Sequence, residues 1–335
     1  MEYSNNVKAG TATVTIKGSG IYSGTVSKNF EIKEALYTVY GYQVVINGNF
    51  DLKYYIDLSK EAANDTDAYI EFKVGDRVQK VKQRETSNGH YVYTCEVPVA
   101  QIGDKVTATL HYKDKSYALT QYSVKDYLNT IVQNKDKKEE YGKAADIASA
   151  ILNYGARAQI YFGYKTDSLV NSVLPDAEIK KVDSILSQDI KKAIANNEIG
   201  VLENNDFKYY GASLVCKSDT GMKLYFENKN SLSLKEIEKK YDISVKDCKK
   251  QISKSINENM ICITINDLNA TELDDNFEVQ ITNKQNSSQS MSVSTSPYIY
   301  IKKSMDLGNA KLINLSKAMY WYSQKAMEYS MTENR

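Results

Sequence analysis

The chain has 335 residues, of which 42% are hydrophobic and 25% charged, a composition typical of folded globular protein rather than of a disordered tail. Its 43 basic and 42 acidic residues give a net charge of +1, which argues against nucleic acid as a partner because such partners call for a basic excess. No apolar run has the length of a membrane span, so we expect no membrane insertion. The length allows two or three domains.

The first 33 residues predict two strands joined by a glycine-rich turn. Apolar residues alternate with threonines over residues 11–16, and a second apolar pattern follows at residues 26–32. Two strands alone are marginally stable in water. We therefore expect this hairpin to need partners that the present chain does not obviously supply.

The order of motifs in this segment resembles the C-terminal half of a bacterial Ig-like repeat. The motifs are Tyr3-Ser-Asn-Asn, the alternating run at 9–16, Gly20-x-Tyr-x-Gly24-Thr and Phe30-x-Ile32. Such repeats are common in secreted and wall-attached proteins of Gram-positive anaerobes, so the resemblance implies a cell-surface or secreted protein. The earlier strands of the repeat are missing, and residues 1–33 are expected to be a partial Ig-like domain that starts inside the repeat.

Residues 34–122 predict a series of short strands. Asn47-Gly48 and Asn88-Gly89 each lie between alternating apolar runs, which is the strongest short signal for a hairpin because both turn residues need positive φ. From Val124 the apolar period becomes helical, with a short helix and then a longer one whose Ala/Tyr stripe includes Tyr154. We interpret residues 34–164 as an Ig-like β-sandwich followed by a helix pair.

Residues 205–335 predict the same plan. Residues 150–161 align with residues 318–329 at a constant offset that matches Tyr154 with Tyr322, and Phe50-x-Leu52 resembles Met222-x-Leu224. The shared order of these similarities indicates an internal tandem repeat. Each longer helix is expected to bury its Ala/Tyr stripe on its own sandwich. The predicted fold class is mainly β with α (α+β).

Two segments are expected to lie outside this repeated plan. Residues 165–204 are predicted to be a helical spacer between the copies, with a helix at 176–195. Residues 235–254 are rich in Lys and Ser and are interpreted as an insertion in the second copy. The predicted domains are therefore 1–33, 34–164, 165–204 and 205–335.

The tandem pattern also resembles an accessory domain of large secreted proteins of gut-type Gram-positive bacteria. The resemblance is carried by Tyr122-Ser-Val-Lys-Asp-Tyr127, residues 150–164 and Leu315-x-x-Ala318-x-x-x-Tyr322, and it covers most of residues 34–330. It implies a domain of unassigned function that sits beside Ig-like repeats, leucine-rich repeats or carbohydrate-active regions. The signal peptide and any anchor are then expected outside this chain, and no catalytic residues carry over.

The sequence contains no familiar catalytic or cofactor-binding motif, and we expect neither an enzyme nor a cofactor or metal site. There are two histidines: His90 is expected to be solvated after its turn, and His111 to lie in a strand. Acidic groups at 272–275 and 65–67 are interpreted as solvated turns, with a weak calcium site as the alternative.

The four cysteines lack metal-binding spacing. Cys95 is expected to be a buried free thiol, and a Cys216–Cys262 bridge stays open as a possibility if their strands are neighbours.

The composition is unusual in its 27 Tyr against 7 Phe and 1 Trp. The plainer interpretation is a chain that uses Tyr on its sheets and helices; the alternative is a set of rings that stack on sugars.

We predict a non-catalytic extracellular module, structural or adhesin-like, monomeric within a longer chain. The alternative is a carbohydrate-binding accessory module of a secreted glycan-active enzyme. The expected partner is a glycan or a host or cell-surface protein, and Tyr55 and Tyr210 are the candidate ligand-binding residues.

Overall fold

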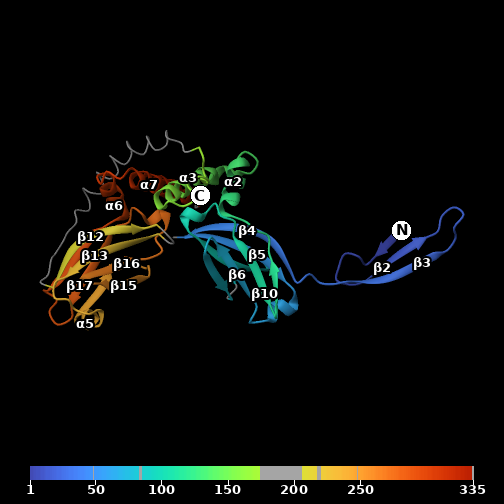
Figure 1. Ribbon diagram of the computed structural model, residues 1–335, viewed down its shortest axis with the longest axis horizontal. Helices are drawn as coiled ribbons and strands as arrows, with labels where there is room; N and C mark the ends of the chain where they lie inside the picture. The colour runs from blue at the N-terminus through green and yellow to red at the C-terminus, as the bar shows by residue number, and fades with distance from the viewer. Residues whose placement is uncertain (48, 83–84, 174–205, 217–219, 247, 334–335) are drawn as a thin grey trace.

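The computed structural model describes the chain except for residues 48, 83–84, 174–205, 217–219, 247 and 334–335. The described residues form five antiparallel sheets and six α-helices, which confirms the predicted class of mainly β with α. Figure 1 shows two groups of sheets side by side, with the longer helices along one side of both and an N-terminal hairpin that extends away. None of the described helices is both long and apolar enough to cross a bilayer.

The N-terminal sheet has an uncovered apolar face. Its strands pair so that Ile16 faces Val26 and Ala12 faces Phe30 on one side of the sheet. Ile16, Val26 and Phe30 nevertheless remain 50%, 71% and 38% exposed, and no residue before Leu36 joins the hydrophobic core of the described chain. The strands are β1 (Glu2–Ser4), β2 (Gly10–Lys17) and β3 (Thr25–Ile32).

The first large sheet pair packs face to face around aromatic side chains. Leu52, Tyr54 and Ile56 alternate on β5 and are fully buried, and the Tyr54 ring lies 5.2 Å from Phe72 of the opposite sheet. Asn88 and Gly89 both have positive φ, as predicted for the hairpin turn. One sheet has the order β4-β5-β9-β8, with β4 (Tyr37–Asn47), β5 (Asn49–Leu58), β8 (Glu85–Ser87) and β9 (His90–Val97). The other has the order β11-β10-β6-β7, with β6 (Tyr69–Val74), β7 (Arg77–Val81), β10 (Thr107–Tyr112) and β11 (Lys115–Ala118). Helix α1 (Lys60–Asn64) joins the two sheets.

The second sheet pair has the same order of elements as the first, except that no described strand corresponds to β7. Its larger sheet has the order β12-β13-β16-β15, with β12 (Phe207–Val215), β13 (Gly221–Asn228), β15 (Ile252–Asn257) and β16 (Met260–Ile265). Its smaller sheet has the order β14-β17-β18, with β14 (Tyr241–Val245), β17 (Phe277–Asn283) and β18 (Ser290–Thr295). Helix α5 (Leu234–Lys240) joins them, in the place that α1 has in the first pair.

The interpretation of residues 235–254 as an insertion is wrong. They contribute α5, β14 and the start of β15, and Ile237, Tyr241, Ile243 and Val245 are all buried. The strand was missed because its three alternating apolar residues are flanked by lysines. The predicted helix at 176–195 lies outside the described residues.

A helix pair follows each sheet pair, as predicted. Ser123 caps α2 in a capping box with Asp126, Ser296 caps α6 ahead of Pro297, and α3 ends at Gly163 with φ 67°. The helices are α2 (Val124–Gln133), α3 (Glu139–Phe162), α6 (Pro297–Met305) and α7 (Ala310–Glu333), and the short 3₁₀ turns η1 (Val99–Gln101) and η2 (Ala270–Glu272) lie beneath them.

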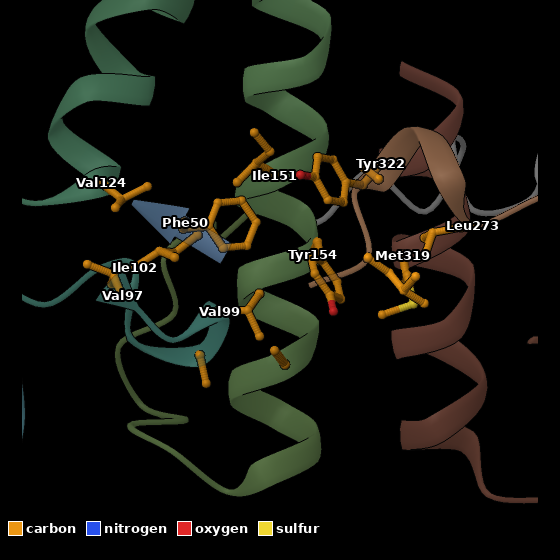
Figure 2. Packing of buried hydrophobic residues seen from close by; sticks show 14 of the residues in the cluster. Phe50, Val97, Val99, Ile102, Val124, Ile151, Tyr154, Leu273, Met319 and Tyr322 are labelled. Atoms are coloured by element: carbon orange, nitrogen blue, oxygen red, sulfur yellow. The ribbon is translucent and has the colours of Figure 1, made fainter. Parts of the chain in front are cut away.

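The two long helices pack against each other. Tyr154 of α3 and Tyr322 of α7 are 1% and 5% exposed, and their rings stack at 5.7 Å with 17° between the planes. The ring centroids of Phe50 of β5 and Tyr322 are 5.8 Å apart, and Figure 2 shows Tyr154, Tyr322 and Met319 between the two helices. The predicted burial of the stripe is confirmed, but the expectation that each stripe packs on its own sheets is met only in part. Tyr322 packs on Tyr154 and Phe50 of the other half.

All four cysteines are free. Cys95 is fully buried, as expected, and burial raises the pKa of its thiol to about 12. Cys216 follows the end of β12, where Val215 faces Gly221, whereas Cys262 faces Tyr225, four residues further along β13. At about 3.3 Å per strand residue the two are too far apart for the disulfide that the sequence left open.

Candidate functional site

The two predicted ligand-binding tyrosines lie in different environments. Tyr55 is half-buried on the outer face of β5, and its hydroxyl donates a hydrogen bond to Gln43 Oε1 at 2.6 Å. Burial raises the pKa of Tyr127 on α2, with Tyr141, Tyr122 and Tyr55 contributing, which places Tyr55 close to that helix. Tyr55 is therefore half-buried, with its hydroxyl bonded within the sheet.

Tyr210 is 77% exposed because a β-bulge lifts it out of register. The pairing of β12 with β13 skips from Tyr209 to Gly211, so Tyr210 is the extra residue of the bulge. Tyr55 and Tyr210 thus belong to different sheets and form no common platform. That either one binds a ligand stays a prediction.

The first half has the same bulge, with Tyr40 in the place of Tyr210. Tyr40 is 69% exposed and its ring stacks on His90 at 3.9 Å. His90 Nδ1 lies 2.6 Å from Asp57 Oδ1, and the His90 side chain is only 18% exposed. The expectation of a solvated His90 is therefore wrong, because the bulge brings an aromatic ring over the turn.

A cleft of about 330 Å³ opens between the two halves of the molecule. Its floor is the outer face of the sheet that contains β12 and β13, and its walls are the end of α3 and the helices α6 and α7. This volume and position are typical of small-molecule sites, which favour interfaces between structural units. The lining residues that bear on its chemistry are Tyr161, Phe162, Ser213, Lys223, Tyr225 and Tyr300.

Three tyrosines from three elements face this cleft. Burial raises the pKa of Tyr300, and Cys216, Tyr161 and Tyr225 contribute in the same direction, so their polar groups lie near one another. A hydrogen bond of 3.0 Å joins the Tyr225 hydroxyl to Ser213 Oγ and fixes that ring on the sheet. The cleft therefore offers ring faces and hydroxyl groups in the same space.

Lys223 adds a positive charge to the cleft floor. It is half-buried on β13, two residues from Tyr225 on the same face, and no carboxylate among the described residues lies in ion-pair distance of it. Some other lysines of this half are paired, such as Lys240 with Asp206 and Lys250 with Glu272, each at 2.7 Å. The cleft thus combines aromatic rings with a cation whose counter-ion the described chain does not provide.

A second, wider hollow of about 700 Å³ lies on the other side of Phe162. Some of its polar groups are already bonded within the protein, whereas the buried Gln101 Oε1 has no hydrogen-bond partner. Arg77 pairs with Glu96 at 2.6 Å, and the Tyr164 hydroxyl donates to Asp104 at 2.5 Å. Because Arg77 and Tyr164 are bonded and the hollow has fewer aromatic side chains in its lining than the cleft, we consider it the weaker candidate for a binding site.

Some of the acidic groups singled out in the sequence have structural partners. Glu272 belongs to the capping box of η2 and pairs with Lys250, and Asp65 accepts a hydrogen bond from the Asp67 backbone. Within the described ranges, no group of three or more His, Cys, Asp or Glu side chains is arranged to hold a metal ion.

The sequence did not identify the cleft residues. Strand parity alone places Lys223 and Tyr225 on the face opposite the buried Met222, Leu224 and Phe226, and could have identified them as outward-facing. No local signal indicates that α3 of the first half reaches this face. A scan against protein-family models and a search of curated proteins found no match for this chain.

Proposed function

We propose that residues 34–335 form a non-catalytic module of an extracellular surface protein, structural or adhesive in role, built from two copies of one Ig-like sandwich with a helix pair. The extracellular setting rests on the sequence resemblances described above. The architecture supports a duplication, and the contact between the copies supports a structural role.

Strand register supports the duplication more strongly than sequence similarity does. A bulge precedes Gly41 in one half and Gly211 in the other, and these glycines face Tyr55 and Tyr225. Each of these tyrosines bonds to a residue two positions after the glycine, Gln43 in the first half and Ser213 in the second.

This register changes one detail of the alignment. It places Thr220, rather than Met222, in the position of Phe50, because each lies five residues before the tyrosine that faces the glycine. Phe50 and Thr220 line the same small cavity beside the stacked tyrosines of α3 and α7. The two copies thus meet through corresponding positions.

The observation that carries the structural role is the aromatic contact between the halves. Tyr154, Tyr322 and Phe50 are each less than a tenth exposed, and their rings lie within 6.5 Å of one another. Buried aromatic contacts of this kind resist opening, because separation exposes each ring to water. Such an interface suits a module that holds its neighbours at a fixed separation.

The alternative of a carbohydrate-binding platform on a sheet face has less support. A platform needs several exposed rings on one surface. Tyr55 is half-buried, Tyr210 lies on a bulge of the other sheet, and Tyr40 stacks on His90. We therefore prefer the structural or adhesive role.

Urea unfolding of the whole chain tests this proposal. Fluorescence of Trp321 on α7, the single tryptophan, follows the helix layer, and far-UV circular dichroism follows all sheets. We expect the two signals to change together, because one interface couples both halves. Two well-separated transitions would contradict a module of fixed shape.

The location of the protein is tested by protease treatment of intact cells of the source organism, followed by immunodetection of the chain. A chain that is protected from the protease until the cells are lysed would contradict a surface role.

A further inference from the structure

The strongest unassigned feature is the difference between two lysines in matching positions. Lys53 on β5 and Lys223 on β13 each lie two residues before the tyrosine that faces the bulge glycine, and each faces a threonine on the next strand, Thr94 or Thr264. Both lysines therefore point to the outer, helix-covered face of their sheet.

In the first half the lysine has a counter-ion. Lys53 Nζ lies 4.0 Å from Glu85 of β8. Across the three strands of the first half, Glu85 pairs with Val92 and Val92 pairs with Tyr55. In the second half, Ser255 pairs with Cys262 and Cys262 pairs with Tyr225. Ser255 thus occupies the place of Glu85, so the carboxylate that serves Lys53 has no counterpart beside Lys223.

The lysine without this carboxylate lines a cleft. In the first half Tyr55 lies near Tyr127 of α2, as Tyr225 lies near Tyr300 of α6 in the second half. In the second half Tyr225, Tyr300 and Lys223 line the 330 Å³ cleft between α3, α6 and α7. A negatively charged ligand in the cleft would give this half-buried lysine the counter-ion that the described chain does not provide.

We propose that this cleft binds a glycan segment that carries a carboxylate. Lys223 forms an ion pair with the carboxylate, and the sugar ring contacts Tyr161, Tyr225 and Tyr300. A sugar has an apolar face of C–H groups and a rim of hydroxyl groups, and tyrosine offers a ring face and a hydroxyl to match them. The cleft volume lies in the range of small-molecule sites. An acidic peptide could also pair with Lys223, but it would make less use of three converging tyrosine hydroxyls.

The inference goes beyond the proposed structural role, and either can fail without the other. The test is an array of carboxylated glycans and their neutral counterparts, screened with the whole chain, followed by calorimetry on the strongest hit. We expect the carboxylated form to bind roughly tenfold or more tightly than its neutral counterpart, as is typical of a hydrogen bond to a charged group. Added salt should weaken the preference.

Matched variants identify the site. Lys223→Gln should abolish the preference for the carboxylated form, whereas Lys53→Gln, in the corresponding position of the first half, should leave binding unchanged. Tyr300→Phe, which keeps the ring and removes one hydroxyl, should weaken binding of both forms several-fold. Urea midpoints equal to that of the unmodified chain check that each variant is folded.

Three results would overturn the inference. The first is that the chain binds none of the carboxylated glycans on the array. The second is a preference that survives Lys223→Gln or disappears in Lys53→Gln. The third is a short oligoglutamate that binds as tightly as the glycan hit and with the same dependence on Lys223, since that would identify an acidic peptide as the ligand.

Discussion

The sheets β4-β5-β9-β8 and β12-β13-β16-β15 have the same strand order but different outer faces. In the first, Lys53 Nζ lies 4.0 Å from Glu85 of the edge strand. In the second, Ser255 has the position of Glu85, and Lys223 lines the cleft. The comparison teaches that one backbone plan can carry different charge pairs on its outward-facing side chains. The following experiments test how far the two halves are equivalent.

The largest effect is expected where the halves meet. Tyr154→Ala and Tyr322→Ala should each lower the free energy of unfolding by about 3 kcal/mol or more, because each removes a buried ring and leaves a cavity. The double variant should cost less than the sum of the two, because the rings stack on each other. Urea unfolding of the four proteins measures this. Strict additivity would mean that the two rings do not act as one contact.

The next effect concerns a carboxyl group that only the first half has. Burial raises the pKa of Asp51 to about 6, with the nearby Glu96 and Asp267 adding to the shift, whereas Gly221 occupies the corresponding strand position. A raised folded-state pKa means that the folded chain binds the proton more tightly than the unfolded chain. The contribution of this group to stability is therefore present below about pH 4 and is lost as the pH rises towards 6.

Asp51→Asn should remove that dependence. Discounted for partial solvent screening, the gain in unfolding free energy at pH 7 should be about 1.5 kcal/mol, with little gain at pH 4. Urea titrations of both proteins between pH 4 and 7 give the difference directly. A gain of equal size at both pH values would show that the effect does not come from the charge.

A smaller difference is expected between the two helix caps. Ser123 accepts from the Asp126 backbone at 3.1 Å and donates to the Asp126 carboxylate at 2.7 Å, whereas Ser296 accepts only from the Ile299 backbone, at 3.3 Å. Ser123→Ala should cost about 1 kcal/mol and Ser296→Ala about half of that. Thermal and urea unfolding check the order. A larger loss for Ser296→Ala would mean that Pro297 does not preset its helix as expected.

The smallest effect is expected at the two bulges. Tyr210→Ala should change the unfolding free energy by less than about 0.5 kcal/mol, because the side chain is 77% exposed. Tyr40→Ala should cost somewhat more, because its ring stacks on His90. Chemical denaturation of both variants, side by side, measures the difference. Equal losses would mean that the stack on His90 adds nothing to stability.

Local patterns predicted much of this architecture. The hairpins, the helix pairs and the buried Tyr154 and Tyr322 follow from alternation, turn residues and helical periodicity. Short strands among lysines, such as β14, gave too weak a pattern, and the environment of His90 depends on a bulge that the sequence does not mark.

The sequence by itself determined most of the strands and helices and which face of each is apolar, because these depend on periods of two and 3.6 residues along the chain. The tertiary structure decided which apolar faces meet. The stacking of Tyr154 on Tyr322 and the convergence of Tyr161, Tyr225, Tyr300 and Lys223 join residues far apart in sequence, from both halves. Such contacts depend on how whole elements pack, and no local period encodes that choice.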